Sequence, residues 1–174
     1  MDEPAIRRIS PKQFLMIDGQ GAPDDSLNYI ATLRRVTKAM GLTPGLPEAL
    51  WWTADGAKAS ADNMDSWRWT VMIEPSGEPT KEAVDAALDK ARQEKDEPAL
   101  SKIRLETYDE GEVVQLVNKG PLPEKQPKLV AMLAFALAQG YKLTGKYHEI
   151  YIDDPGPDSP PDAKTILRQP VAKS

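Results

Sequence analysis

The chain has no cysteine and only one histidine, His148, among its 174 residues. Without cysteine it can form no disulfide, no thiolate metal site and no cysteine nucleophile. A metal site or a Ser-His-Asp triad built on a single histidine would lack partners that the sequence points to. We therefore expect neither a metal nor a cofactor.

Long apolar runs are also missing. No segment reaches the length of about 20 residues that a membrane-spanning helix needs, and residues 1–10 lack the apolar core of a secretory signal. These absences predict a soluble protein that stays in the cytoplasm and has no membrane partner.

Positive charge is in deficit, because 22 Lys and Arg residues face 27 Asp and Glu residues, which gives a formal charge of −5. Such a chain gains little from releasing the counterions of a phosphate backbone, so we expect no nucleic-acid partner. The hydrophobic share of 40% and the charged share of 28% are those of a folded globular protein. The length suits one compact domain or two small fused halves.

The first half of the chain has the pattern strand, helix, strand, strand. An apolar run at 13–21, ended by Gly19, Gly21 and Pro23, predicts a buried strand that enters a turn. Apolar residues then recur at helical spacing over 24–40, up to a glycine stop. The stretches 48–53 and 67–74 are rich in aromatic and β-branched residues and predict strands, with a loop at 56–65 between them. Residues 80–93 predict a helix with Thr80 as its N-cap, which we interpret as a crossover between halves.

The second half repeats this order. The stretches 103–108 and 113–117 predict a hairpin around Asp109, Glu110 and Gly111. Residues 124–139 predict an unusually apolar helix, which we expect to be largely buried. Two further strands are predicted at 147–152 and 164–171.

Glu48 and Glu149 each open a strand that continues with apolar and aromatic residues, so we align the two halves on them. This alignment predicts an α+β fold of duplicated βαββ units with pseudo-two-fold symmetry. We expect antiparallel sheets with helices on one side and a ligand groove at the seam. The chain would be a single ligand-binding domain, with repeat one at about 12–76, the crossover helix at about 80–95 and repeat two at about 101–171. It would act as a monomer or a homodimer.

Six stretches along almost the whole chain resemble one known family. They are FLMIDGQGAP at 14–23, PEALWW at 47–52, WRWTVMIEP at 67–75, EGEVVQ at 110–115, HEIYI at 148–152 and TILRQP at 165–170. In this order they resemble the GyrI-like small-molecule-binding proteins, which are related to the drug-sensing domains of bacterial multidrug regulators. The resemblance implies two βαββ repeats around a central pocket, and a carboxylate near the middle of that pocket.

The tryptophan-rich strands and the His-Glu-Ile-Tyr stretch are most similar to one branch of that family, the cyclopropanoid cyclopropyl hydrolases. This similarity implies an enzyme that uses water to open the strained ring of DNA-alkylating antibiotics, in self-protection or antibiotic resistance. The implied ligand is small, planar and hydrophobic.

Four tryptophans and one tyrosine are candidate ligand-binding residues. Strand alternation sends Trp51 and Trp52 to opposite faces, whereas Trp67 and Trp69 share one face, so the four cannot all line one pocket. Aromatic residues on strands are usually core, and they can also offer a stacking surface to a flat ligand. Tyr108 could add a phenol donor to a ligand carbonyl.

Glu149 is the leading catalytic candidate, because a carboxylate in an apolar strand is costly to bury without partners. Ionised, it attracts a cationic ligand; as a base, it takes a proton from water. Tyr147 and Tyr151 share its strand parity and are expected to face the same way, where a phenol could stabilise a developing phenolate. The alternative is an aromatic face packed on a helix, with Glu149 at its rim or in solvent. Glu48, the aligned carboxylate, is a candidate for ligand binding or simply marks the start of a strand.

Three functions fit these residues. The first is a hydrolase without a cofactor, which holds a planar electrophile between aromatic rings while Glu149 activates water. The second is a binding module that senses or sequesters hydrophobic drugs, including cationic ones, with no turnover. The third is a gyrase-inhibitor-like interaction protein, which follows only from the family resemblance.

Overall fold

The chain forms two compact units in the computed structural model, which describes residues 3–56 and 61–174. The first unit is Lys12–Tyr108, and the second combines the N-terminal residues up to Pro11 with Asp109–Ser174. The elements of the first unit are β2 (Lys12–Gln20), α1 (Asp24–Ala39), β3 (Pro44–Thr53), the short helix η1 (Ala61–Ser66), β4 (Trp67–Pro75), α2 (Lys81–Glu94), the short helix η2 (Pro98–Lys102) and β5 (Arg104–Tyr108). Those of the second unit are β1 (Ala5–Ile9), β6 (Gly111–Lys119), α3 (Leu122–Ala138), β7 (Tyr141–Leu143), β8 (Tyr147–Tyr151) and β9 (Lys164–Lys173).

The two units repeat one order of elements. The first runs β2, α1, β3, β4, and the second runs β6, α3, β8, β9 with the short β7 after its helix. This confirms the α+β class and the duplicated βαββ order predicted from the sequence. Part of the loop expected at 56–65 falls on residues 57–60, which lie outside the described ranges.

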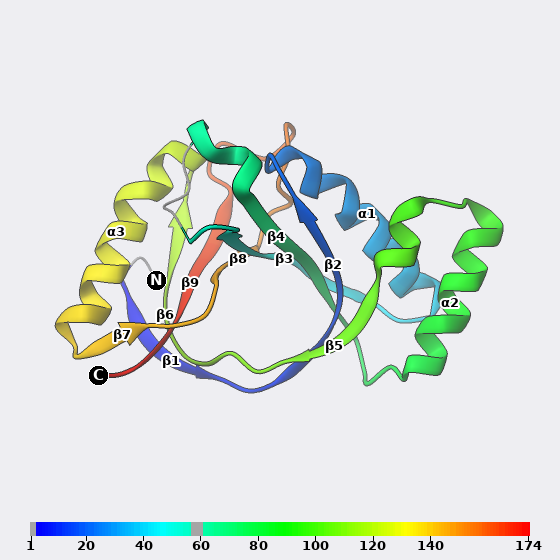
Figure 1. Ribbon diagram of the computed structural model, residues 1–174, viewed down its shortest axis with the longest axis horizontal. Coiled ribbons are helices and arrows are strands. Elements are labelled where there is room, and N and C mark those ends of the chain that lie inside the picture. The colour runs from blue at the N-terminus through cyan, green and yellow to red at the C-terminus, as the bar shows by residue number, and fades with distance from the viewer. Residues whose placement is uncertain (1–2, 57–60) are drawn as a thin grey trace. The chain divides into compact units, whose positions relative to one another are not determined.

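The sheet of the first unit is antiparallel, with the strand order β3-β4-β2-β5. Odd-numbered side chains of its strands form the core beneath α1. The helix α2 lies beside α1 (Figure 1). Thr80 caps α2 as predicted, because its side chain accepts a hydrogen bond of 3.1 Å from the amide of Ala83. The core on this side includes Leu15, Ile17, Leu33, Val36, Trp69, Val71, Ile73, Val84 and Leu88.

The second unit has the strand order β1-β6-β9-β8, and β7 pairs with the C-terminal end of β9. The helix α3 packs on β6, β7 and β9 (Figure 1). The side chains buried between the helix and the sheet are Val114, Leu116, Met132, Ala136, Leu167 and Val171.

The predicted hairpin of 103–108 with 113–117 is wrong. The strand β5 pairs with β2 in the first unit, and β6 pairs with β1 in the second. A glycine with positive φ does follow β5, since Gly111 has φ 71°. Turn chemistry only redirects the chain, however, and the strands that flank a turn can each find another partner. The short strands β1 and β7 were not predicted.

The expectation that the third helix is largely buried is also wrong. Val130 and Leu137 are 58% and 57% exposed, whereas Met132 and Ala136 are buried. Apolar composition all around a helix does not say which of its sides meets the sheet. None of the helices in the described ranges has both the length and the apolar character needed to cross a membrane.

Candidate functional site

A buried carboxylate lies at the centre of β8, on the face of the second unit that α3 covers. Glu149 is 3% exposed and pairs with Leu167 of β9, which belongs to the core beneath α3. Strand alternation puts Tyr147 and Tyr151 on the same side. Both tyrosines donate hydrogen bonds to the carboxylate, Tyr147 to Oε2 at 2.8 Å and Tyr151 to Oε1 at 2.9 Å. The prediction that these three side chains project together is confirmed.

A third donor reaches Glu149 from the helix. The ammonium group of Lys125, in the first turns of α3, contacts Glu149 Oε2 as a hydrogen-bonded ion pair. The side chain of Lys125 is 18% exposed, so this pair lies at the edge of the buried region rather than deep in the core. Lys125 was not predicted from the sequence, because its contact depends on how the helix packs on the sheet. The only local signal was a lysine near the start of a predicted helix.

We call Lys125, Tyr147, Glu149 and Tyr151 the carboxylate cluster. Burial raises the pKa of the Tyr147 phenol well above its ordinary value, and the nearby Glu149 charge raises it further. Tyr147 therefore remains a proton donor at neutral pH. The cluster joins a proton acceptor to two phenols and one ammonium group, which is the set needed to activate water and to meet a developing oxyanion.

The opposite face of β8 carries a different polar group. His148, 1% exposed, contacts Glu110 with 2.7 Å between Nδ1 and Oε2. Arg168 of β9 donates to the other oxygen of Glu110 at 3.0 Å, and to Gln115 of β6 at 2.9 Å. Burial acts to raise the pKa of Glu110, but the hydrogen bonds and charges of His148 and Arg168 outweigh it and lower that pKa below its usual range.

This second group is structural in character, since each of its charges is paired. His148 has the parity opposite to Glu149, as expected, and so lies on the other side of the strand. In the part of the chain that the structure describes, no group of three or more His, Asp and Glu side chains is placed to hold a metal ion.

Three of the four tryptophans share the helix-covered face of the first unit. Trp51 and Trp69 are cross-strand neighbours, and the rings of Trp51 and Trp67 meet edge to face with centroids 6.4 Å apart. The Trp69 ring lies 5.4 Å from that of Tyr29 on α1. Trp67 donates from Nε1 to the side chain of Asn63 at 3.0 Å. Among the described residues, the Nε1 atoms of Trp51 and Trp69 are buried without a hydrogen-bond partner.

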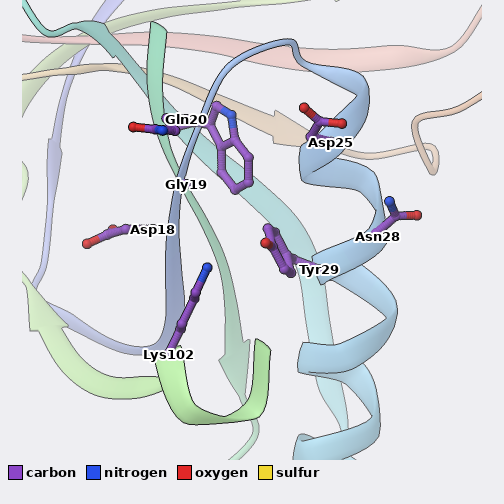
Figure 2. Close-up of a pocket in the computed structure, with 8 residues that line it drawn as sticks. Asp18, Gly19, Gln20, Asp25, Asn28, Tyr29 and Lys102 are labelled. Atoms are coloured by element: carbon purple, nitrogen blue, oxygen red, sulfur yellow. The ribbon is translucent and has the colours of Figure 1, made fainter. Parts of the chain in front are cut away.

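A cavity of about 590 Å³ opens beside these rings, within the first unit (Figure 2). Figure 2 shows Lys102 of η2 reaching up between Asp18 of β2 and Tyr29 of α1. Close packing at its wall depends on Gly19, because a Cβ there would come within 2.1 Å of the Trp69 ring. The cavity is lined by Asp18, Gly19, Gln20, Asp25, Asn28, Tyr29, Trp69 and Lys102. Of the two glycines that the sequence placed at the end of this strand, Gly19 lies within β2, and only Gly21, with φ 97°, lies in the link between β2 and α1.

The remaining candidates, Glu48, Trp52 and Tyr108, lie on the opposite face of the first unit. Glu48 is 8% exposed and pairs with Met72, which lies in a small core on that face. Trp52 and Tyr108 pack against the same core. The expected division of Trp51 from Trp52 is thus confirmed.

The alignment of Glu48 with Glu149 needs correction. Glu149 is on the helix-covered face of its unit, and Glu48 is on the face away from the helices. The residue that matches Glu149 by face and register is Ala49, and Glu48 matches His148. A shift of one residue exchanges the two faces of a strand, so an alignment from composition alone could not detect the error.

Comparison with known proteins identifies similar solved structures. No family model matches the chain, and no curated protein is close enough to count as a match. An uncharacterized conserved protein from Listeria innocua has 28% sequence identity and a TM-score of 0.88, over 98% of this chain and 92% of that one. A hydrolase from Listeria innocua has 28% identity and a TM-score of 0.83 over the same shares of the two chains. The C-terminal domain of EcmrR has 16% identity and a TM-score of 0.64, over 99% of this chain and 98% of that one, which shows the fold alone. Over nearly its whole length, the chain is similar in fold to a bacterial hydrolase and to the C-terminal domain of EcmrR.

Proposed function

We propose that the chain is a hydrolase that binds a small, planar, hydrophobic molecule at the carboxylate cluster and adds water to a strained electrophile without a cofactor. The observation that carries this proposal is the buried Glu149, held by two phenols and an ammonium group. The similarity to a Listeria innocua hydrolase over 98% of the chain supports the reaction class.

The hydrogen bonds on Glu149 leave one acceptor position of its carboxylate unused. Among the described residues, Oε2 accepts from both Tyr147 and Lys125, whereas Oε1 accepts only from Tyr151. A carboxylate oxygen has two lone pairs, so Oε1 can accept one more hydrogen bond, from water. Glu149 then acts as the general base on that water.

The substrate class that we propose is a spirocyclopropyl-cyclohexadienone, in which a strained ring is conjugated to a carbonyl. The water oxygen bonds to a ring carbon while Glu149 takes its proton. The strained C–C bond breaks, and its electron pair moves through the conjugated system to the carbonyl oxygen, which becomes a phenolate. A tyrosine of the cluster donates a hydrogen bond to this oxygen and then a proton. Glu149 returns the proton that it took from water to this tyrosine, with which it shares a hydrogen bond, so the net change is the addition of one water.

A second candidate is a binding module without turnover. It is favoured by the fact that Glu149 accepts hydrogen bonds from three protein donors, which is a stable arrangement in its own right. The phenol rings of Tyr147 and Tyr151 could then hold a planar drug without any chemistry.

One experiment separates the two candidates. The protein is incubated with a spirocyclopropyl-cyclohexadienone antibiotic, and the compound is followed by mass spectrometry for the gain of one water. A rate above that of heat-denatured protein supports the hydrolase. Unchanged compound with saturable binding supports the module, and neither binding nor conversion would refute both.

A further inference from the structure

The carboxylate cluster contains one negative and one positive charge in direct contact. Glu149 has a side chain only 4% exposed, and the ammonium of Lys125 rests on its Oε2. Tyr147 stays a neutral phenol, because burial and the Glu149 charge raise its pKa. Lys125 therefore compensates the charge that would otherwise make this site attract cations.

We propose that Lys125 determines the charge of the ligand, so that the cluster accepts neutral planar molecules and rejects lipophilic cations of the same shape. This inference deepens the proposed function and rests on it. A buried carboxylate with no cationic partner is a strong counter-ion for an organic cation. With Lys125 at the same oxygen, a cationic ligand gains attraction from Glu149 and meets repulsion from the ammonium at a similar distance. The attraction and the repulsion nearly cancel for a cation, whereas the binding of a neutral ring does not depend on either charge.

The same charge pair suits a neutral electrophile that becomes negative as it reacts. The developing oxyanion adds charge next to an ammonium and two phenols, so the cluster favours the transition state over the ground state. For a cationic substrate, the cluster would not stabilise the transition state more than the ground state in this way. The substrate class that fits is therefore neutral before reaction and anionic on one oxygen during it.

The test uses two flat probes of nearly equal shape, acridine, which is neutral at about pH 8, and 10-methylacridinium, which carries a fixed positive charge. Binding is measured by fluorescence titration with the full chain and with Lys125→Gln. We expect the wild-type chain to prefer acridine, and Lys125→Gln to bind 10-methylacridinium about 10- to 100-fold more tightly, since one unit charge within a few ångströms has been removed. The affinity for acridine should change by less than about threefold.

Two further variants serve as controls. Lys125→Arg keeps the charge and should keep the wild-type preference, which also shows that a changed side chain at this position is tolerated. Lys142→Gln removes an exposed lysine of β7 and changes the net charge equally, so it should leave both affinities unaltered. An equal gain in cation affinity from Lys142→Gln would mean that net charge, and not Lys125, is responsible.

The outcomes distinguish this inference from the proposed function. The inference is overturned if wild-type protein binds 10-methylacridinium as tightly as acridine, or if Lys125→Gln leaves the preference unchanged. If acridine binds selectively but no antibiotic is hydrolysed, the charge preference stands and the enzymatic proposal fails. If neither probe binds to either protein, the charge inference is overturned, and hydrolysis of the antibiotic still decides the enzymatic proposal.

Discussion

Replacing Glu149 by Gln tests the cluster most directly, because the substitution keeps the shape of the side chain and removes its charge. The amide oxygen can still accept from Tyr147 and Lys125, and the amide nitrogen would face Tyr151, whose hydroxyl can turn to accept. The main loss is the counter-charge of Lys125. Breaking a fully buried pair costs about 3–5 kcal/mol, and we expect about 1–3 kcal/mol here, because Lys125 is 18% exposed and can reach water. For a chain of this length, that corresponds to a fall in Tm of about 3–10 °C.

The catalytic effect should be much larger than the structural one. Without a general base, turnover of the antibiotic should fall by about 10²- to 10⁴-fold, while the variant stays folded at 25 °C and still binds the compound. The assays are product formation by mass spectrometry, binding by fluorescence titration and thermal unfolding by circular dichroism, all on one preparation.

A matched control is Glu48→Gln, which removes a buried carboxylate of the first unit, on the face away from the helices. It should leave turnover within about threefold of the wild type, whatever its effect on stability. The reasoning is refuted if Glu149→Gln turns over at the wild-type rate, or if Glu48→Gln abolishes turnover in a folded protein.

Three more predictions concern Tyr147, Gly19 and Glu110. Tyr147→Phe removes the phenol that donates to Glu149 and that would turn to donate to the developing oxyanion, so kcat should fall by on the order of 10² with little change in Tm; an unchanged kcat would exclude this phenol as a catalytic group. Gly19→Ala places a Cβ against the rigid Trp69 ring and should lower the free energy of unfolding by about 1–3 kcal/mol, as measured by urea denaturation; the double variant with Trp69→Leu should lose less than the sum of the two single changes. Glu110 has a folded-state pKa below its unfolded value of 4.5, so its ionised form stabilises the protein above that pH, and this stabilisation is lost as the pH falls through the lowered pKa. Urea unfolding of Glu110→Gln should therefore show a deficit at pH 7 that shrinks below about pH 4, and a deficit independent of pH would contradict the ion-pair account.

Local features of the chain were predictable from the sequence, because they depend on residues close together along it. Alternation in a strand assigned Tyr147, Glu149 and Tyr151 to one side and His148 to the other. A threonine before a helical pattern gave the N-cap of α2, and each βαββ order followed from the change between strand and helix periodicity.

Register and strand partners were not predictable in the same way. The turn residues around Gly111 are compatible with β5 pairing either with β6 or with β2. Which partner β5 takes is determined by the hydrogen bonds of the folded sheet, in which β5 pairs with β2. The alignment of Glu48 with Glu149 was wrong by one position. Amino-acid composition cannot detect a shift of one residue, but in the structure such a shift puts the side chain on the other face of the sheet.

The sequence by itself therefore determined which side chains of β8 act together, since the period of a strand is set by its own covalent geometry. Only the tertiary structure decided what meets them. Lys125 reaches Glu149 across 24 residues of chain, and Glu110 reaches His148 across 38. Such contacts depend on how a helix or a connecting segment packs against the sheet, and no short-range pattern in the sequence encodes that packing.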